Sequence, residues 1–255
     1  MGCCKVEVKD FVATITYDRP PVNATFSQAY DEIRDTIYAL ELRDDIKVVV
    51  MTGAGKCFMA GNDLGEFGEF GTREQCVPYF DKLRNAYMAV KNCKYPTIGA
   101  INGAAFGAGL IFASCFDMLV ASEKAKFSLA EIKVGIVGGD GFLSMLVPQK
   151  VVNYMALTGN PLTAAELARY GGIHKVVPPE ELMAAAYALA GEITPLARRA
   201  LLVWKENLKR NTKDNKLEEK FFSNLQGTLD FQPYHDFTEA SKAFLEKREP
   251  QYDNK

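Results

Sequence analysis

The sequence predicts an α/β fold in residues 1–178, followed by a helical region in residues 179–255. Short, continuously apolar runs such as 46–52 and 97–101 have the length and character of strands buried on both faces. Between them lie stretches such as 27–43, in which apolar residues recur at helical spacing. After Pro178 the strand patterns nearly stop and amphipathic helical patterns follow. Because these later helices have no core of their own, we expect them to pack on the first region or on a neighbouring subunit.

Composition excludes several classes of protein. The 255 residues carry a net charge of −2, and no basic run is present, so nucleic acid is not an expected partner. Six cysteines without a paired spacing indicate reduced thiols, and only two histidines argue against a metal centre. No segment has the pattern of a signal peptide or a membrane span. We therefore expect a cytoplasmic protein without membrane association or bound metal.

Turn and cap residues mark the individual elements. Lys9 and Asp10 indicate a tight turn between two strands, and Ser27 is the expected N-cap of the first helix. Thr163 and Glu166 have the spacing of a capping box, and Thr194 is the expected cap of a later helix. The remaining predictions are strands at 116–121 and 173–177, and helices at 72–91, 107–115, 179–190, 195–209, 214–225 and 238–247.

The stretch 95–141 contains the features with the clearest chemical meaning. A strand at 97–101 leads through a glycine-rich turn into a helix that begins near Ala108. Glycines let a ligand approach the backbone, and the first amides of a helix donate towards negative charge. Two carboxylates, Glu131 and Asp140, follow in the same stretch. This segment therefore predicts an anion site with acid–base groups beside it.

Ordered blocks in the sequence resemble the enoyl-CoA hydratase/isomerase family, also called the crotonase superfamily. The first block is GAGKCFMAGNDL at 53–64, the second covers 101–117 and 125–135, and the third is AFLEKR at 243–248. The resemblance covers nearly the whole chain. It implies a spiral of strand–strand–helix repeats with a C-terminal helical region that supports homotrimers or homohexamers. It also implies an acyl-CoA thioester substrate and no separate cofactor, since coenzyme A is part of the substrate.

The resemblance further implies an oxyanion hole made by the backbone amides of Ala60 and Ala108. Removing a proton next to a thioester, or adding water to its conjugated double bond, places negative charge on the carbonyl oxygen. Fixed amides that point at such an oxygen typically contribute ~3 kcal/mol each. Taken alone, Ala60 has the alternative explanation of a small residue packed under a strand, and Ala108 that of an alanine at the start of a helix.

Glu131 matches one of the two glutamates that flank water in family hydratases, whereas Ile111 stands at the position of the other. We therefore expect chemistry with one glutamate, such as double-bond migration, with the pKa of Glu131 raised by apolar neighbours. Asp140 is a second candidate, because some relatives that cleave carbon–carbon bonds of β-diketones have a carboxylate in this loop. Its alternative role is to cap the following helix. A non-catalytic acyl-CoA-binding protein is a further alternative.

Contacts to the substrate and coenzyme A are carried over from the same resemblance. They comprise backbone near the first block, the glycine-rich turns, and positions on the C-terminal helices. The expected contact residues are Met59, Asn62, Asp63, Leu64, Gly107, Ile111, Gly139, Phe222, Phe244 and Lys247.

Overall fold

The computed structural model describes residues 2–67, 73–211, 216–231 and 233–252. A six-stranded sheet runs through the molecule in the order β1-β2-β3-β5-β7-β10, and only β1 and β2 pair antiparallel in it. Every residue of β3 and β5 is buried, as their unbroken apolar sequences predict. The strands are β1 (Cys4–Lys9), β2 (Val12–Tyr17), β3 (Val48–Gly53), β5 (Thr97–Ile101), β7 (Met118–Ser122) and β10 (Lys175–Val177).

A second, four-stranded sheet has the order β4-β6-β8-β9. Its strands are β4 (Cys57–Met59), β6 (Ala104–Phe106), β8 (Lys126–Ser128) and β9 (Leu162–Thr163). The chain passes from a strand of the first sheet to a strand of the second and then into helical segments, as in β3, β4, α2 and α3, and again in β5, β6 and α4. This repetition confirms the predicted spiral of strand–strand–helix turns.

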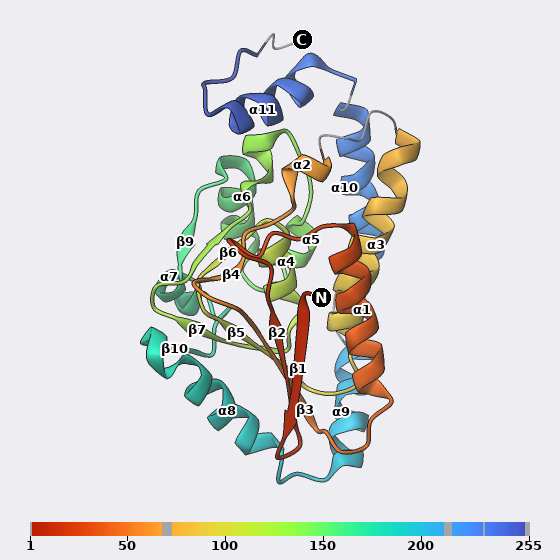
Figure 1. Cartoon of the computed structure of the whole chain (residues 1–255), viewed down its shortest axis with the longest axis vertical. Coiled ribbons are helices and arrows are strands. Elements are labelled where there is room, and N and C mark those ends of the chain that lie inside the picture. The colour runs from red at the N-terminus through yellow and green to blue at the C-terminus, as the bar shows by residue number, and fades with distance from the viewer. Residues whose placement is uncertain (1, 68–72, 212–215, 232, 253–255) are drawn as a thin grey trace.

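Helices cover both faces of the first sheet (Figure 1). On one side, α1 (Ser27–Glu41), α3 (Arg73–Asn92) and α4 (Ala108–Cys115) share a large core in which aromatic rings meet edge to face. On the other side, α8 (Leu182–Ile193) packs on β3, β5 and β7 in a second core. The remaining segments before α8 are α2 (Leu64–Phe67), η1 (Ala130–Val134), α5 (Asp140–Leu143), α6 (Gln149–Thr158), α7 (Ala164–Arg169) and η2 (Pro179–Glu181).

Two of the predicted caps are wrong and one is confirmed. Phe26 occupies the N-cap of α1, and the N–H of Ser27 instead donates to the Glu66 carboxylate at 2.9 Å. Thr194 is the C-cap of α8 rather than the start of the next helix. The capping box of Thr163 and Glu166 is present at α7, with both reciprocal bonds formed. At the start of α1, the acceptor for a backbone N–H is therefore Glu66, which is distant in sequence, rather than the side chain of Ser27.

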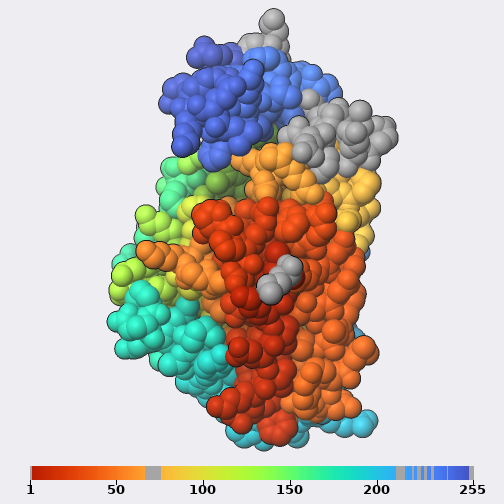
Figure 2. Space-filling view, in the orientation of Figure 1, coloured from red at the N-terminus to blue at the C-terminus, as the bar shows by residue number. Residues whose placement is uncertain are grey.

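The C-terminal helices are α9 (Arg198–Asn211), α10 (Leu217–Phe231) and α11 (His235–Glu246). The predicted start of α10 at residue 214 lies outside the described residues. The buried Lys205 on α9 pairs with Asp117 at 2.6 Å, and Ser241 on α11 donates to the carbonyl of Val134 at 2.9 Å. Figure 2 shows the dark blue residues of α11 at the top of the molecule, above the red strands and helix of the N-terminal part, whereas α9 lies near the lower end in Figure 1. None of the described helices is long and apolar enough to cross a membrane.

Candidate active site

The two predicted oxyanion residues lie at the ends of paired strands. Ala60 directly follows β4, and Ala108 is the first residue of α4, just after β6. Because β4 and β6 are parallel neighbours, the chain leaves both strands at the same edge of the small sheet. The Ala60 N–H donates to the carbonyl of Val22 at 3.2 Å. The Ala108 N–H has no acceptor among the described residues, as is usual for the first amide of a helix.

Glycine is required on both sides of Ala108. Gly107 has φ of 51°, in the left-handed region, and a Cβ there would lie 2.8 Å from Oε1 of Glu131. A Cβ on Gly109 would lie 2.2 Å from the carbonyl oxygen of Met59, so only glycine lets α4 approach β4. These two positions bring the start of α4 close to both the Ala60 loop and the Glu131 carboxyl group.

Glu131 is in η1, and its carboxyl group reaches the cavities described below. The residue as a whole is half-buried, but Oε2 is buried and has no hydrogen-bond partner within the described part of the chain. Burial raises the pKa of Glu131 to about 8, against a small opposing effect of a backbone hydrogen bond. A carboxyl group with such a pKa exchanges protons near neutral pH, which is the property of a general acid–base group.

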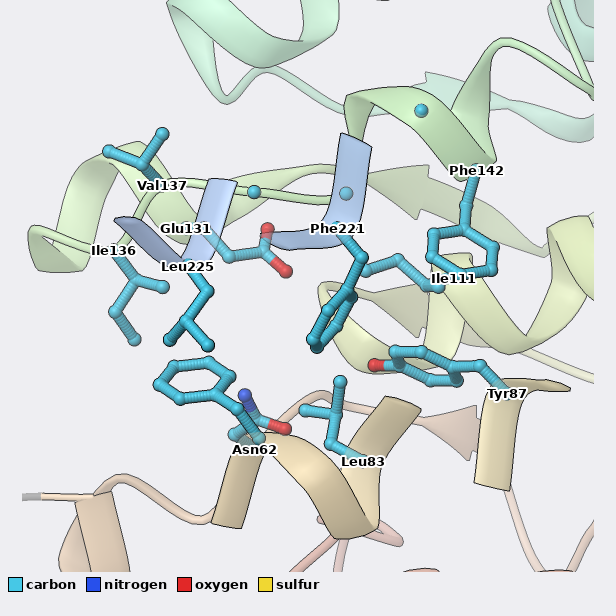
Figure 3. A pocket seen from close by; sticks show the side chains of 14 residues that line it. Asn62, Leu83, Tyr87, Ile111, Glu131, Ile136, Val137, Phe142, Phe221 and Leu225 are labelled. Atoms are coloured by element: carbon cyan, nitrogen blue, oxygen red, sulfur yellow. The ribbon is translucent and has the colours of Figure 1, made fainter. Parts of the chain in front are cut away.

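A narrow cavity of about 40 Å³ lies beside Glu131, and we call it the apolar cavity. Figure 3 shows the Glu131 carboxyl group pointing into this space, with Ile111 and Tyr87 across from it. Polar groups come from Asn62, Tyr87 and Glu131, and the other side chains in its wall are apolar. The wall is formed by Asn62, Phe80, Leu83, Tyr87, Ile111, Glu131, Ile136, Val137, Gly138, Gly139, Gly141, Phe142, Phe221 and Leu225.

A second, larger space of about 350 Å³, the glycine-lined cavity, is lined by Ala60 and by Gly107, the residue before Ala108. It shares Asn62, Glu131 and Ile136 with the apolar cavity, so the Glu131 carboxyl group lies where the two meet. A thioester placed where the two cavities meet would have the Glu131 carboxyl group on one side and the amides near Ala60 on the other. The wall is formed by Ala60, Gly61, Asn62, Leu64, Phe106, Gly107, Ser128, Ala130, Glu131, Lys133, Val134, Ile136, Gly159, Pro161 and Phe244.

Asp140 lines a third cavity, which Glu131 also lines. The helix α5 begins at Asp140 itself, and its N-cap is Gly139 with φ of 92°. Asp140 is therefore in the first helical turn rather than in the capping position that the sequence suggested. The two carboxylates that were singled out from the sequence thus share the wall of one cavity.

The predicted contact residues on the C-terminal helices differ in their positions. Phe244 lines the glycine-lined cavity from the same chain. The ring of Phe222 lies under Arg84, 5.1 Å from its guanidinium carbon, and lines none of the three cavities. Lys247 is the exposed C-cap of α11. The contacts of these three residues with coenzyme A therefore stay predictions.

Within the first block, the predicted contacts are held by neighbouring side chains. Asp63 pairs with Arg19 at 2.6 Å, and this bond lowers the pKa of Asp63. The Asn62 side-chain oxygen accepts from the Tyr30 hydroxyl and from Thr25. Leu64 lines the glycine-lined cavity, whereas Met59 is fully buried. Among the residues that the structure describes, no group of histidines, cysteines and carboxylates could hold a metal ion.

Sequence reasoning missed the wall that α3 and α10 contribute. Phe80, Leu83 and Tyr87 recur at helical spacing on one face of α3, and Phe221 and Leu225 recur similarly on α10. This spacing is visible in the sequence, but it is equally typical of ordinary core packing. Only the folded chain distinguishes a face that lines a cavity from one that fills a core.

Comparisons with known proteins show the family to which the chain belongs. Residues 7–255 match the family model described as Enoyl-CoA hydratase/isomerase. Carnitinyl-CoA dehydratase of Salmonella arizonae is 35% identical over 253 residues, which is 94% of each chain. The (7aS)-7a-methyl-1,5-dioxo-2,3,5,6,7,7a-hexahydro-1H-indene-carboxyl-CoA hydrolase of Mycobacterium tuberculosis is 34% identical over 200 residues, 77% of this chain and 80% of the hydrolase.

A solved structure extends the likeness to the fold. The crystal structure of carnitinyl-CoA hydratase from Mycobacterium avium superposes with a TM-score of 0.87 at 31% identity, and all of both chains is covered. The strand–strand–helix spiral and its helical C-terminal region are therefore the crotonase fold. With its fold, its motifs and nearly its whole length in agreement, the chain belongs to the enoyl-CoA hydratase/isomerase family of enzymes.

Proposed function

We propose that the protein moves a proton at the carbon next to the thioester of an enoyl-CoA, with Glu131 as its single acid–base residue. The observation that carries the proposal is the carboxyl group of Glu131. Its Oε2 atom is buried and lacks a hydrogen-bond partner among the described residues, and the carboxyl group lies where the apolar and glycine-lined cavities meet. With a pKa of about 8, Glu131 can accept a proton from a weakly acidic carbon and return it, because both its protonated and its ionised form are accessible near neutral pH.

Charge that develops on the thioester oxygen requires donors, and we assign the amides of Ala60 and Ala108 to this role. Both follow strands that pair in parallel, and Gly107 places Glu131 directly beside the start of α4. Donors of this kind are held in place by the fold, which limits reorganisation as the charge develops. The Ala60 N–H must first exchange its bond to Val22 for one to the thioester oxygen. An enolate held in this way is the shared intermediate of proton transfer, hydration and dehydration.

The apolar side chain of Ile111 favours isomerisation over hydration. It lines the same cavity as Glu131, in the place where the resemblance would put a second carboxylate. A methyl surface cannot orient a water molecule, and it keeps that side of the carboxyl group dry. One glutamate is then sufficient to carry a proton from one carbon to another.

The test is an assay of the purified protein in heavy water with a 3-enoyl-CoA, with products followed by mass spectrometry. We expect deuterium incorporation and 2-enoyl product before any 3-hydroxyacyl product. Glu131→Gln should lower turnover by ~10²–10⁴-fold while acyl-CoA still binds. Efficient hydration of a 2-enoyl-CoA by the wild-type protein, or full activity in Glu131→Gln, would contradict the assignment.

A second candidate function is cleavage of a carbon–carbon bond in a β-dicarbonyl acyl-CoA. It is favoured by one observation, namely that Asp140 and Glu131 line the same cavity. One relative is named as a hydrolase of a dioxo acyl-CoA. Under this alternative Asp140→Asn should cost more turnover than Glu131→Gln, whereas under the first proposal it should cost little.

Assembly into homotrimers or homohexamers is part of the same proposal. On α9, large apolar side chains face outwards, with Trp204 65% exposed and Val203 54% exposed. Exposed apolar surface of this kind commonly forms contacts between subunits. Light scattering at micromolar concentration should therefore give the mass of three or six chains.

A further inference from the structure

The apolar cavity contains a polar atom that the proposed proton transfer does not use. Tyr87 on α3 is 1% exposed, and its hydroxyl group has no hydrogen-bond partner in the described part of the molecule. A buried hydroxyl group without a partner costs free energy, so most such groups in folded proteins are paired. In Figure 3 the hydroxyl oxygen of Tyr87 points towards the middle of the cavity rather than into the packed core.

The ring of Tyr87 cannot easily turn to find another partner. It lies edge to face against Phe112, with ring centroids 4.7 Å apart, and 5.4 Å from the ring of Phe142. Neighbours at van der Waals distance on two sides fix both side-chain torsions. The hydroxyl group is therefore held at one place in the cavity wall before any ligand binds.

The other polar groups in this wall have different positions and uses. The side-chain oxygen of Asn62 already accepts from Tyr30, and Glu131 is assigned to proton transfer. The rest of the wall is apolar, including Phe80 and Leu83 on the same face of α3. Burial raises the pKa of Tyr87 well above its usual value. The group thus stays protonated and donates a hydrogen bond at neutral pH.

We propose that the Tyr87 hydroxyl group determines specificity, by donating a hydrogen bond to an oxygen atom carried by the acyl group of the substrate. This inference rests on the acyl-CoA function proposed above and narrows it to acyl groups that bear an oxo or hydroxyl oxygen beyond the thioester. A plain hydrocarbon chain would fit the apolar walls but would leave the hydroxyl group unpaired. Sites built to bond a polar substrate group discriminate strongly against analogues that lack it.

The test compares wild type with Tyr87→Phe on matched substrates. We would use a six-carbon 3-enoyl-CoA and counterparts with one oxo group at the fifth or sixth carbon, and measure kcat/KM for each. In wild type at least one oxo substrate should exceed the plain chain by about tenfold or more. Tyr87→Phe should lower kcat/KM for that oxo substrate by about 10–100-fold and change the plain chain by less than about twofold.

A second readout needs no turnover. Calorimetric titration with saturated oxo and plain acyl-CoA should show the same loss of preference in Kd. Tyr95→Phe is the matched control, because Tyr95 is equally buried but its hydroxyl group donates to the carbonyl of Arg43, and Tyr95 lines none of the three cavities. It should lower thermal stability and leave the preference unchanged. Tyr87→Phe should fold normally, since it keeps the ring contacts and removes only an unpaired group.

The outcomes separate this inference from the function on which it rests. Absence of preference in wild type, or an equal loss for plain and oxo substrates in Tyr87→Phe, would overturn the role of Tyr87 while the proton-transfer function stands. Failure of wild type to bind or turn over any acyl-CoA in the set would overturn the proposed function itself, and this inference with it.

Discussion

Replacing Glu131 by glutamine should stabilise the fold, and the gain should increase with pH. The pKa of this carboxyl group is raised from 4.5 to about 8, because the ionised form is poorly solvated by water when it is buried in the cavity wall. Glutamine keeps the shape and carries no charge at any pH. We therefore predict that the free energy of unfolding of Glu131→Gln exceeds that of wild type by an amount that grows as the pH rises.

The sign and size follow from linkage between folding and proton binding. Below pH 4.5 the group is protonated in both the folded and the unfolded chain, so its contribution is constant. Between 4.5 and about 8 only the unfolded chain ionises, and wild type loses about 1.4 kcal/mol of stability per pH unit. The full interval corresponds to about 5 kcal/mol. Because Glu131 is half-buried and water screens part of its charge, we expect about 2–4 kcal/mol.

Urea unfolding followed by far-UV circular dichroism, at several pH values from 5 to 8 and at one protein concentration, would measure this difference. Glu166→Gln is a useful control, since hydrogen bonds from Thr163 lower the pKa of Glu166 below its usual value of 4.5. This carboxylate is ionised in the folded and the unfolded chain between pH 6 and 8, so the stability difference between wild type and Glu166→Gln should not change with pH there. The stability that it adds is lost only when the pH falls below 4.5. Parallel pH profiles for wild type and Glu131→Gln would refute the claim that burial suppresses ionisation.

Three further predictions follow from single positions. Gly107→Ala should lower the free energy of unfolding by at least about 1 kcal/mol more than Gly55→Ala in urea unfolding. Both glycines have positive φ, but only a Cβ at Gly107 would meet Glu131, so turnover by Gly107→Ala should fall as well. Equal losses of stability would contradict this prediction. Ile111→Glu should raise the ratio of 3-hydroxyacyl to 2-enoyl product from a 3-enoyl-CoA. An unchanged ratio in a folded variant would contradict the idea that the apolar side chain of Ile111 prevents hydration by keeping water from Glu131. Trp204→Glu should shift light-scattering mass towards a single chain, and an unaltered assembly would place the interface elsewhere.

The sequence was a good guide wherever local pattern and tertiary environment agree. The apolar run of β5 predicted a buried strand with the observed bounds, because a strand buried on both faces needs no alternation. The two-residue and three-residue strands β4, β6, β8 and β9 were not predicted as strands. They are too short to show a period, and they exist because the spiral brings each one beside its neighbour. Long-range pairing of this kind leaves little trace in local sequence.

In the candidate site, too, some features can be predicted from local sequence and others arise only from contacts between distant segments. Glu131 could be singled out because an ordered block surrounds it, and its raised pKa could be expected from apolar neighbours. Tyr87, whose hydroxyl group has no partner among the described residues, could not be singled out, because its position at helical spacing from Leu83 is also that of a core residue. Glu66 as the acceptor for the first amide of α1 was equally hidden, since the two are brought together only by the fold.

The Val22 carbonyl adds a physical point about the proposed oxyanion hole. It accepts from the Ala60 N–H at 3.2 Å, so this amide is already paired before substrate binds. A neutral thioester oxygen that replaces it exchanges one ordinary hydrogen bond for another and gains little free energy. An oxygen that carries developing negative charge forms a stronger, charge-assisted bond and gains more. The bond to Val22 is lost in the bound substrate and in the transition state alike, so it limits the affinity for substrate without reducing the difference between the two bonds to the thioester oxygen. In the proposed reaction that difference is the part of binding that raises the rate.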